Sequence, residues 1–250
     1  MTPFTWHDAY YSDLQSLYAL LVVPLAFLAW RLVAPPDPAR AVVPRAAPLV
    51  AGATLLFALE TMLDPIATGP LLRTDALRGT IASQLVPFAF VYLGDLRVLI
   101  VAFGVAFAGA PLGWILGRAA VATAIVPVFA GTLHALVRAV FPDADPQWLW
   151  MIYEAGFLAL CIYAVRVWLP REAGRAETAI GPEAQAFLGA LFGFSAAYYA
   201  LWLSADLLIV VAGLDLGWAI RMVPNQLYYA FWAPFIYARF FLRGSTNGSR

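Results

Sequence analysis

The chain has 250 residues, of which 63% are hydrophobic and 12% are charged, and its formal net charge is zero. Soluble domains carry about 25% charged residues, so this composition, with a mean hydropathy of +0.78, excludes an ordinary water-soluble protein and indicates an integral membrane protein. Zero net charge, with arginines spread along the loops, gives no support to nucleic-acid binding.

Residue usage excludes further classes. All 15 basic residues are arginine, and a chain without lysine cannot hold retinal through a Schiff base, so a rhodopsin is excluded. The single cysteine, Cys161, cannot form an intrachain disulfide and is interpreted as a core residue. The period-2 alternation of a membrane β-barrel is absent, so the sequence predicts an all-α transmembrane bundle that forms one domain over residues 1–250.

Apolar stretches of about 20 residues recur along the chain, each long enough to cross a hydrocarbon core about 30 Å thick. The N-terminal sequence MTPFTWHDAYYSD has no basic region before them, so we expect no cleaved signal peptide. Seven spans are predicted, at 14–33, 46–66, about 80–97, 119–141, 147–169, 186–211 and 217–241.

The segment 97–117 is the ambiguous part of this assignment. Because the third span is expected to end at GDLR, the residues after it are predicted to form a re-entrant or interfacial stretch that turns at GAPLG (109–113). The alternative reading makes 97–117 a complete span, which would give eight helices.

Arginine placement orients the predicted spans, because basic residues collect in cytoplasmic loops. Three arginine clusters are expected on the cytoplasmic side: Arg31, Arg40 and Arg45; Arg166, Arg171 and Arg175; and Arg239, Arg243 and Arg250. The opposite loops carry Asp8, Asp13, Asp143, Asp145 and Asp215. We therefore predict an outside N-terminus and a cytoplasmic C-terminus, in the inner (plasma) membrane of a cell.

Helical rise places the intramembrane polar residues at one level, in the outer half of the bilayer. Glu60 and Asp64, in ALETMLDPIATGP, share one helix face because they are four residues apart. His134, Glu154, Asp206, Asn225 and Gln226 are expected in the same layer, with Arg138 and Arg221 near the rim. Charged groups at such depth face the bundle interior or a wet cavity. We predict one pocket that contains Glu60, His134, Glu154, Asp206 and Asn225.

Asp95 and Arg97, in YLGDLRVL, are expected outside this layer. The predicted end of the third span puts them near the inner face of the membrane. We interpret them as a structural pair at the membrane boundary, where charged side chains reach the headgroups.

The pocket is expected to work without a metal or another cofactor. The chain has two histidines and neither the HExxH motif of zinc proteases nor the Glu-x-x-His pairs of di-iron bundles. Apolar surroundings favour the neutral form of a carboxyl group, which makes Glu60 a candidate proton donor, and aromatic faces stabilise positive charge. The candidate catalytic residues are Glu60, Asp206, Glu154 and His134. The candidate substrate-binding residues are Asp64, Tyr153, Trp202, Asn225, Gln226 and Tyr228, and the expected partner is a membrane lipid or another apolar small molecule.

In these features the chain resembles the small seven-helix membrane terpene cyclases of meroterpenoid pathways, which have a similar length, no metal motif, a functional Glu in the second helix and an Asp near the C-terminal end. Glu60 and Asp206 match those two positions. The resemblance implies protonation of an olefin or epoxide on a prenylated substrate, with Glu60 as the acid and Asp206 as its partner. The chain departs from the family at Leu59, where an aromatic residue is expected, and in the complete helix that follows Asp206.

Two other functions are compatible with the sequence. A non-catalytic subunit or assembly factor of a larger membrane complex, for example an energy-transducing one, would pair Glu60 and Glu154 with arginines and leave no ligand-sized cavity. A small-solute or proton-coupled transporter would need titratable groups along the whole path, and the inner half offers only Gln84, Asp95 and Arg97.

Overall fold

The computed structural model describes residues 4–72, 74, 76–77, 79–175, 178 and 180–242, without the side chain of Gln84, and is all-α over these ranges. Arg73, Asp75, Arg78, Arg243 and Arg250 lie outside the described residues. The α-helices are α1 (Trp6–Tyr10), α2 (Ala19–Val33), α3 (Ala47–Ile66), α4 (Ala82–Ala106), α5 (Leu112–Val140), α6 (Gln147–Tyr163), α7 (Leu169–Ala173), α8 (Pro182–Asp206), α9 (Leu216–Asn225) and α10 (Trp232–Tyr237).

Short helical segments of other pitch extend or join these helices. The π-helical ones are η1 (Leu14–Tyr18), η4 (Ala67–Leu71), η5 (Ala164–Trp168), η6 (Leu207–Val211), η7 (Gln226–Phe231) and η8 (Ala238–Leu242), and the 3₁₀ turns are η2 (Pro38–Arg40) and η3 (Pro44–Ala46).

Six helical runs are long and apolar enough to cross a membrane: Leu14–Val33, Pro44–Leu71, Leu85–Ala106, Leu112–Val140, Gln147–Ala173 and Pro182–Val211. The prediction of a multi-pass helical membrane protein is confirmed. The predicted last span, 217–241, is also helical throughout, as α9, η7, α10 and η8 in succession. Polar residues, among them Arg221, Asn225 and Gln226, make this run less apolar than the other six.

The segment 97–117 is neither re-entrant nor a separate span. Helix α4 continues through Arg97 to Ala106, and α5 begins at Leu112, several residues before its predicted start. The predicted turn at 109–113 overlaps the observed turn at 107–111, but Leu112 and Gly113 already belong to α5. The run RVLIVAFGVA is apolar enough to continue the helix, so Asp95 lies near the middle of α4.

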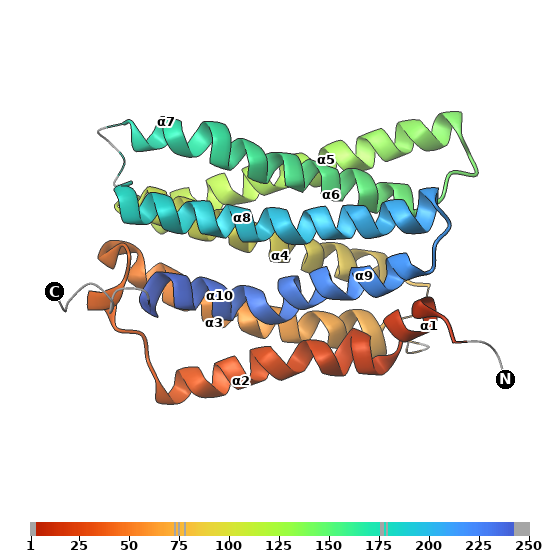
Figure 1. The fold of residues 1–250 in the computed structure, drawn as a ribbon, viewed down its shortest axis with the longest axis horizontal. Helices are drawn as coiled ribbons and strands as arrows, with labels where there is room; N and C mark the ends of the chain where they lie inside the picture. Colours follow the sequence, from red (N-terminus) through yellow and green to blue (C-terminus); the bar gives the residue numbers. More distant parts are fainter. Residues whose placement is uncertain are drawn as a thin grey trace.

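The last helical run lies at the centre of the bundle. Figure 1 shows α9 and α10 between α8 on one side and α2 and α3 on the other, and contacts join α8 to α9 and α3 to α10. Trp232, Ile236 and Phe240, one helical turn apart, have no exposed surface. Helix α5 contacts α4 and α6 at the periphery and is the least buried of the six spans. The least apolar run is therefore packed between other helices of the bundle.

Loops gather at two ends of the bundle (Figure 1). The end that carries α1, the α5–α6 loop and Asp215 is called the α1 end here. The end that carries η2, η3 and the α7–α8 loop, with Arg40, Arg45 and Arg175, is called the arginine end. At the α1 end, Gly213 with φ +64° makes the turn into α9, a backbone conformation that favours glycine.

Candidate functional site

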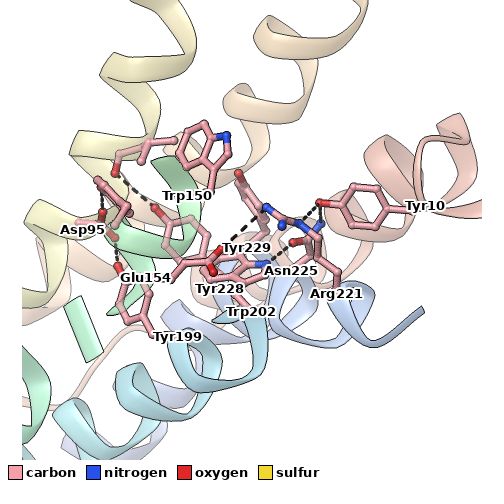
Figure 2. A pocket seen from close by; sticks show the side chains of 12 residues that line it. Tyr10, Asp95, Trp150, Glu154, Tyr199, Trp202, Arg221, Asn225, Tyr228 and Tyr229 are labelled. Atoms are coloured by element: carbon pink, nitrogen blue, oxygen red, sulfur yellow. Dashed lines mark hydrogen bonds and ion pairs between the residues drawn. The ribbon is translucent and has the colours of Figure 1, made fainter. Parts of the chain in front are cut away.

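A cavity of about 170 Å³ lies inside the bundle toward the α1 end (Figure 2). It is lined by Tyr10, Val91, Asp95, Trp150, Tyr153, Glu154, Tyr199, Trp202, Arg221, Asn225, Tyr228 and Tyr229. Seven of these twelve side chains are tyrosine or tryptophan, and four carry a carboxyl, guanidinium or amide group. The cavity is thus an aromatic chamber with a few polar groups in its wall.

Asp95 forms the deep end of this wall. The hydroxyl groups of Tyr153 on α6 and Tyr199 on α8 each donate a hydrogen bond to one of its carboxyl oxygens. A Cβ at the preceding residue, Gly94, would lie 1.8 Å from the hydroxyl oxygen of Tyr228, so a larger residue there would require the Tyr228 ring to move. The sequence GDLR therefore lets an aromatic ring pack directly beside a buried carboxyl group.

Arg97, two residues further along α4, has no exposed surface. Its Nη2 donates to the backbone oxygen of Tyr228 at 2.7 Å, and its Nη1 lies 3.9 Å from Oε2 of Glu60. The guanidinium also packs over two rings, 4.2 Å from the centre of Tyr228 and 4.6 Å from that of Trp232. The prediction that Asp95 and Arg97 form a pair at the membrane boundary is corrected. Both are buried near the middle of α4, where partners on other helices satisfy them.

Arg221 on α9, whose side chain is 12% exposed, organises another part of the wall. Its Nη1 donates to Asp206, which has no exposed surface, and the Gln147 amide donates to the other Asp206 oxygen at 2.7 Å. Its Nη2 lies 3.8 Å from Oε1 of Glu154. The other Glu154 oxygen, Oε2, is buried and has no hydrogen-bond partner among the described residues.

Helix α1 contributes Tyr10 to the cavity wall. The hydroxyl of Tyr10 accepts hydrogen bonds from Arg221 and Asn225, each at 3.2 Å, and Trp202 donates to Asn225 at 2.8 Å. The carboxylate of Asp215 accepts the backbone N–H groups of Trp6 and His7. Figure 2 shows Tyr10 reaching the cavity from the opposite side to Asp95.

The structure brings together part of the predicted site. Glu154, Tyr153, Trp202, Asn225 and Tyr228 line the cavity, whereas Glu60, Asp64, His134, Asp206 and Gln226 do not. The expectation of a single pocket containing Glu60, His134, Glu154, Asp206 and Asn225 is therefore corrected.

The residues that do not line the cavity are held elsewhere for different physical reasons. On α3, Glu60 faces Arg97 and Asp64 faces Tyr229 of η7. On α8, Asp206 faces Arg221. His134 sits on peripheral α5, with a buried Nε2 that has no hydrogen-bond partner within the described part of the chain.

Sequence reasoning did not assign Asp95, Arg97 and Tyr10 to the site. The signal for the first two was available, because a Gly-Asp-x-Arg in the middle of an apolar run of 25 residues needs partners inside the bundle. Tyr10 lies before the first span and gave no comparable signal.

Comparisons with protein-family models, with curated proteins and with solved structures found no match to this chain. Among the residues that the structure describes, no three His, Cys, Asp or Glu side chains are grouped so that they could hold a metal ion.

Proposed function

We propose that the cavity carries out metal-independent acid–base chemistry on the apolar end group of a membrane lipid or isoprenoid. The observation that carries this proposal is Glu154, a residue 4% exposed that lines an aromatic cavity together with Asp95 and whose Oε2 has no hydrogen-bond partner among the described residues. A carboxyl group in such a wall donates a proton in its neutral form and accepts one in its charged form.

The reaction class follows from these groups. The neutral Glu154 carboxyl transfers its proton to one carbon of a C=C bond, whose π electrons form the new C–H bond. The carboxylate and a carbocation result, and the surrounding rings stabilise the positive charge. Loss of a proton from an adjacent carbon, directly or after a second C=C bond has closed a ring, restores an alkene and returns the proton to a carboxylate. The product is an isomer or a cyclic isomer of the substrate, so no oxidant or reductant is needed.

The residue roles differ from those that the cyclase resemblance implies. Glu60 is engaged with Arg97, and Asp206 with Arg221 and Gln147, so neither lines the cavity. We assign the proton donor to Glu154 and the second carboxyl group to Asp95. Tyr153, Trp202, Tyr228 and Asn225 are proposed to hold the substrate, and a cyclase-like reaction on a prenylated lipid stays a proposal.

The size of the cavity limits what enters it. Pockets that enclose a drug-sized ligand occupy about 300–1,000 Å³, and this one has about 170 Å³. We infer that only the reacting end of the substrate is enclosed and that the remaining chain stays among the helices and lipids.

The topology that suits this function has seven spans. With Leu216–Leu242 as the seventh, the α1 end faces outward and the arginine end faces the cytoplasm, as the distribution of arginines favours. The cavity then opens toward the outer face, in the inner (plasma) membrane of a cell.

One observation favours a second candidate, a structural subunit of a membrane complex. Glu60 and Glu154 each have an arginine partner, as that function requires. The cavity beside Glu154 argues for the enzyme, because a purely structural ion pair needs no empty volume next to it.

The test is deuterium incorporation. The protein is reconstituted in liposomes that contain prenyl alcohols and prenylquinones, incubated in D₂O, and the lipids are analysed by mass spectrometry. Protonation and deprotonation at carbon leave deuterium in the lipid. We expect incorporation with the native chain, a loss of at least about a hundredfold with Glu154→Gln, and full activity with Glu172→Gln.

Glu172 is a matched control because it is also a buried glutamate with an arginine partner, Arg175, but lies at the arginine end. No deuterium in any lipid with the native chain would reject the proposed function. Equal incorporation by Glu154→Gln and the native chain would reject the role of Glu154.

A further inference from the structure

The polar clusters around the cavity contain more carboxyl groups than arginines. Five carboxyl groups are each at most 8% exposed: Glu60, Asp64, Asp95, Glu154 and Asp206. Within the described residues, the arginines that pair with members of this set are Arg97 and Arg221. Five carboxyl groups against two guanidinium groups leave a surplus of three.

A surplus of this size must be neutralised inside a membrane. Each uncompensated charge near the bilayer centre costs about 2.5–3.5 kcal/mol on insertion scales. Hydrogen bonds from Tyr153 and Tyr199 stabilise Asp95 but supply no positive charge. The missing charge therefore comes from protons or from a bound cation.

The cavity has the wall that a bound organic cation requires. Glu154 lines the cavity, and its Oε2 is buried with no hydrogen-bond partner in the described part of the chain. Asp95 lies in the same wall, and aromatic rings supply the rest. Cations are attracted to such rings most strongly when water is excluded. Arg221 also lines the cavity, and its guanidinium is engaged with Asp206, with the hydroxyl of Tyr10 and, at 3.8 Å, with Oε1 of Glu154, which leaves Oε2 of Glu154 without an arginine partner among the described residues.

We propose that this cavity binds a small organic ammonium group, between the carboxyl groups of Glu154 and Asp95 and the surrounding aromatic rings. The inference deepens the proposed function and rests on it for its meaning, since the ammonium occupies the place where positive charge develops on the protonated substrate. A volume of about 170 Å³ equals that of between five and six water molecules at roughly 30 Å³ each. That space suits a quaternary ammonium group with its methyl substituents.

The experiment measures binding without any reaction. Tetramethylammonium chloride is titrated into the purified full chain in nanodiscs of neutral lipid, at constant ionic strength, while tryptophan fluorescence is recorded. Trp150 and Trp202 line the cavity and report its occupancy. We expect a saturable change with tetramethylammonium and none with sodium chloride or with tert-butanol, which has a similar shape and no charge.

Two variants test the wall. Glu154→Gln is expected to weaken binding at least about tenfold, which corresponds to about 1.4 kcal/mol, and Glu172→Gln to leave it unchanged. Trp150→Leu alters a ring that is 36% exposed, so the chain should still fold, and it is expected to weaken binding several-fold.

The outcomes separate this inference from the proposed function. No saturable change with the native chain, an equal response to tert-butanol, or equal affinity in Glu154→Gln would each overturn the cation site. Deuterium incorporation would then still support acid–base chemistry. Conversely, tetramethylammonium binding with no incorporation in any lipid would retain the site and reject the enzyme.

Discussion

Arg97 is the residue whose surroundings are least like those of an ordinary arginine. It has no exposed surface, two aromatic rings cover it, and its charge faces Glu60. A backbone carbonyl in π-helical η7 accepts one of its N–H groups. Because helices α3, α4 and the last helical run all contribute, this arginine links three parts of the bundle at one point.

Replacing Arg97 by Met keeps a long side chain and removes the charge. Removing one partner of a buried pair leaves the other uncompensated, at a cost of about 3–5 kcal/mol. We therefore expect a clear fall in the melting temperature of Arg97→Met in detergent. The double variant Arg97→Met/Glu60→Gln should recover part of the loss, since the unpaired carboxyl group is gone. A single variant as stable as the native chain would contradict the importance of the pair.

Gly94 tests how tightly the ring of Tyr228 packs. A Cβ there would lie 2.6 Å from the ring carbon Cζ as well as against the hydroxyl, and Trp202 and Arg97 pack against the same ring. We expect Gly94→Ala to cost about 1–3 kcal/mol through overpacking, measured by thermal unfolding. Gly52→Ala is the control, because no atom lies within 4 Å of a Cβ at that helical position. Equal melting temperatures for the two variants would contradict the close contact.

At the scale of elements, α1 is a five-residue helix that cannot be stable alone. Thr5 caps it through the N–H of Asp8, Asp215 holds its first turn, and Tyr10 attaches it to the cavity wall. The rings of His7, Tyr10 and Tyr11 pack around Trp218. The position of α1 beside the cavity thus depends on contacts with α9 and with Asp215, the residue that precedes α9.

Asp215→Ala removes the acceptor of two backbone N–H groups. We expect faster hydrogen–deuterium exchange in the N-terminal peptide that contains Trp6 and His7, with the rest of the bundle unchanged. Asp143→Ala, in an exposed loop at the same end, is the matched control. Unchanged exchange in Asp215→Ala would show that the aromatic contacts alone hold α1.

The elements that sequence patterns predicted well are the long apolar runs, because length and composition decide whether a helix crosses lipid. The end of α4 was misplaced at Asp95 and Arg97, since a charged pair in an apolar run is typical of a membrane boundary. The partners that make burial favourable, Tyr153, Tyr199 and the carbonyl of Tyr228, come from residues 58 to 131 positions away. No local pattern contains that information.

The same reason explains how much of the candidate site was predicted. Depth along a helix brought Glu154, Asn225 and Tyr228 to one level, and they do share the cavity wall. Depth alone does not state which way a side chain points, so Glu60 and Asp206 were included although each faces an arginine instead. Rotation of each helix about its axis is set by packing between helices, which the sequence does not state locally.

At the scale of the whole molecule, the orientation in the membrane is testable by cysteine labelling. Cys161 is 2% exposed, so the native chain should not react with a membrane-impermeant maleimide. In intact cells we expect Asp143→Cys, at the α1 end, to be labelled from outside. Ala39→Cys, at the arginine end, should be labelled only after the membrane is opened. The reverse pattern would invert the proposed topology.

The central position of the last helical run has a consequence for how the chain is made. Residues 216–242 leave the ribosome after all six apolar runs, yet they fill the middle of the bundle and carry the backbone and aromatic partners of Arg97. Until they arrive, Arg97 and Glu60 lie in a partly assembled bundle that exposes them to lipid or to the insertion machinery. We therefore expect nascent chains stalled before residue 216 to be less resistant to protease than longer ones, because Arg97 lacks its partners Tyr228 and Trp232 in them.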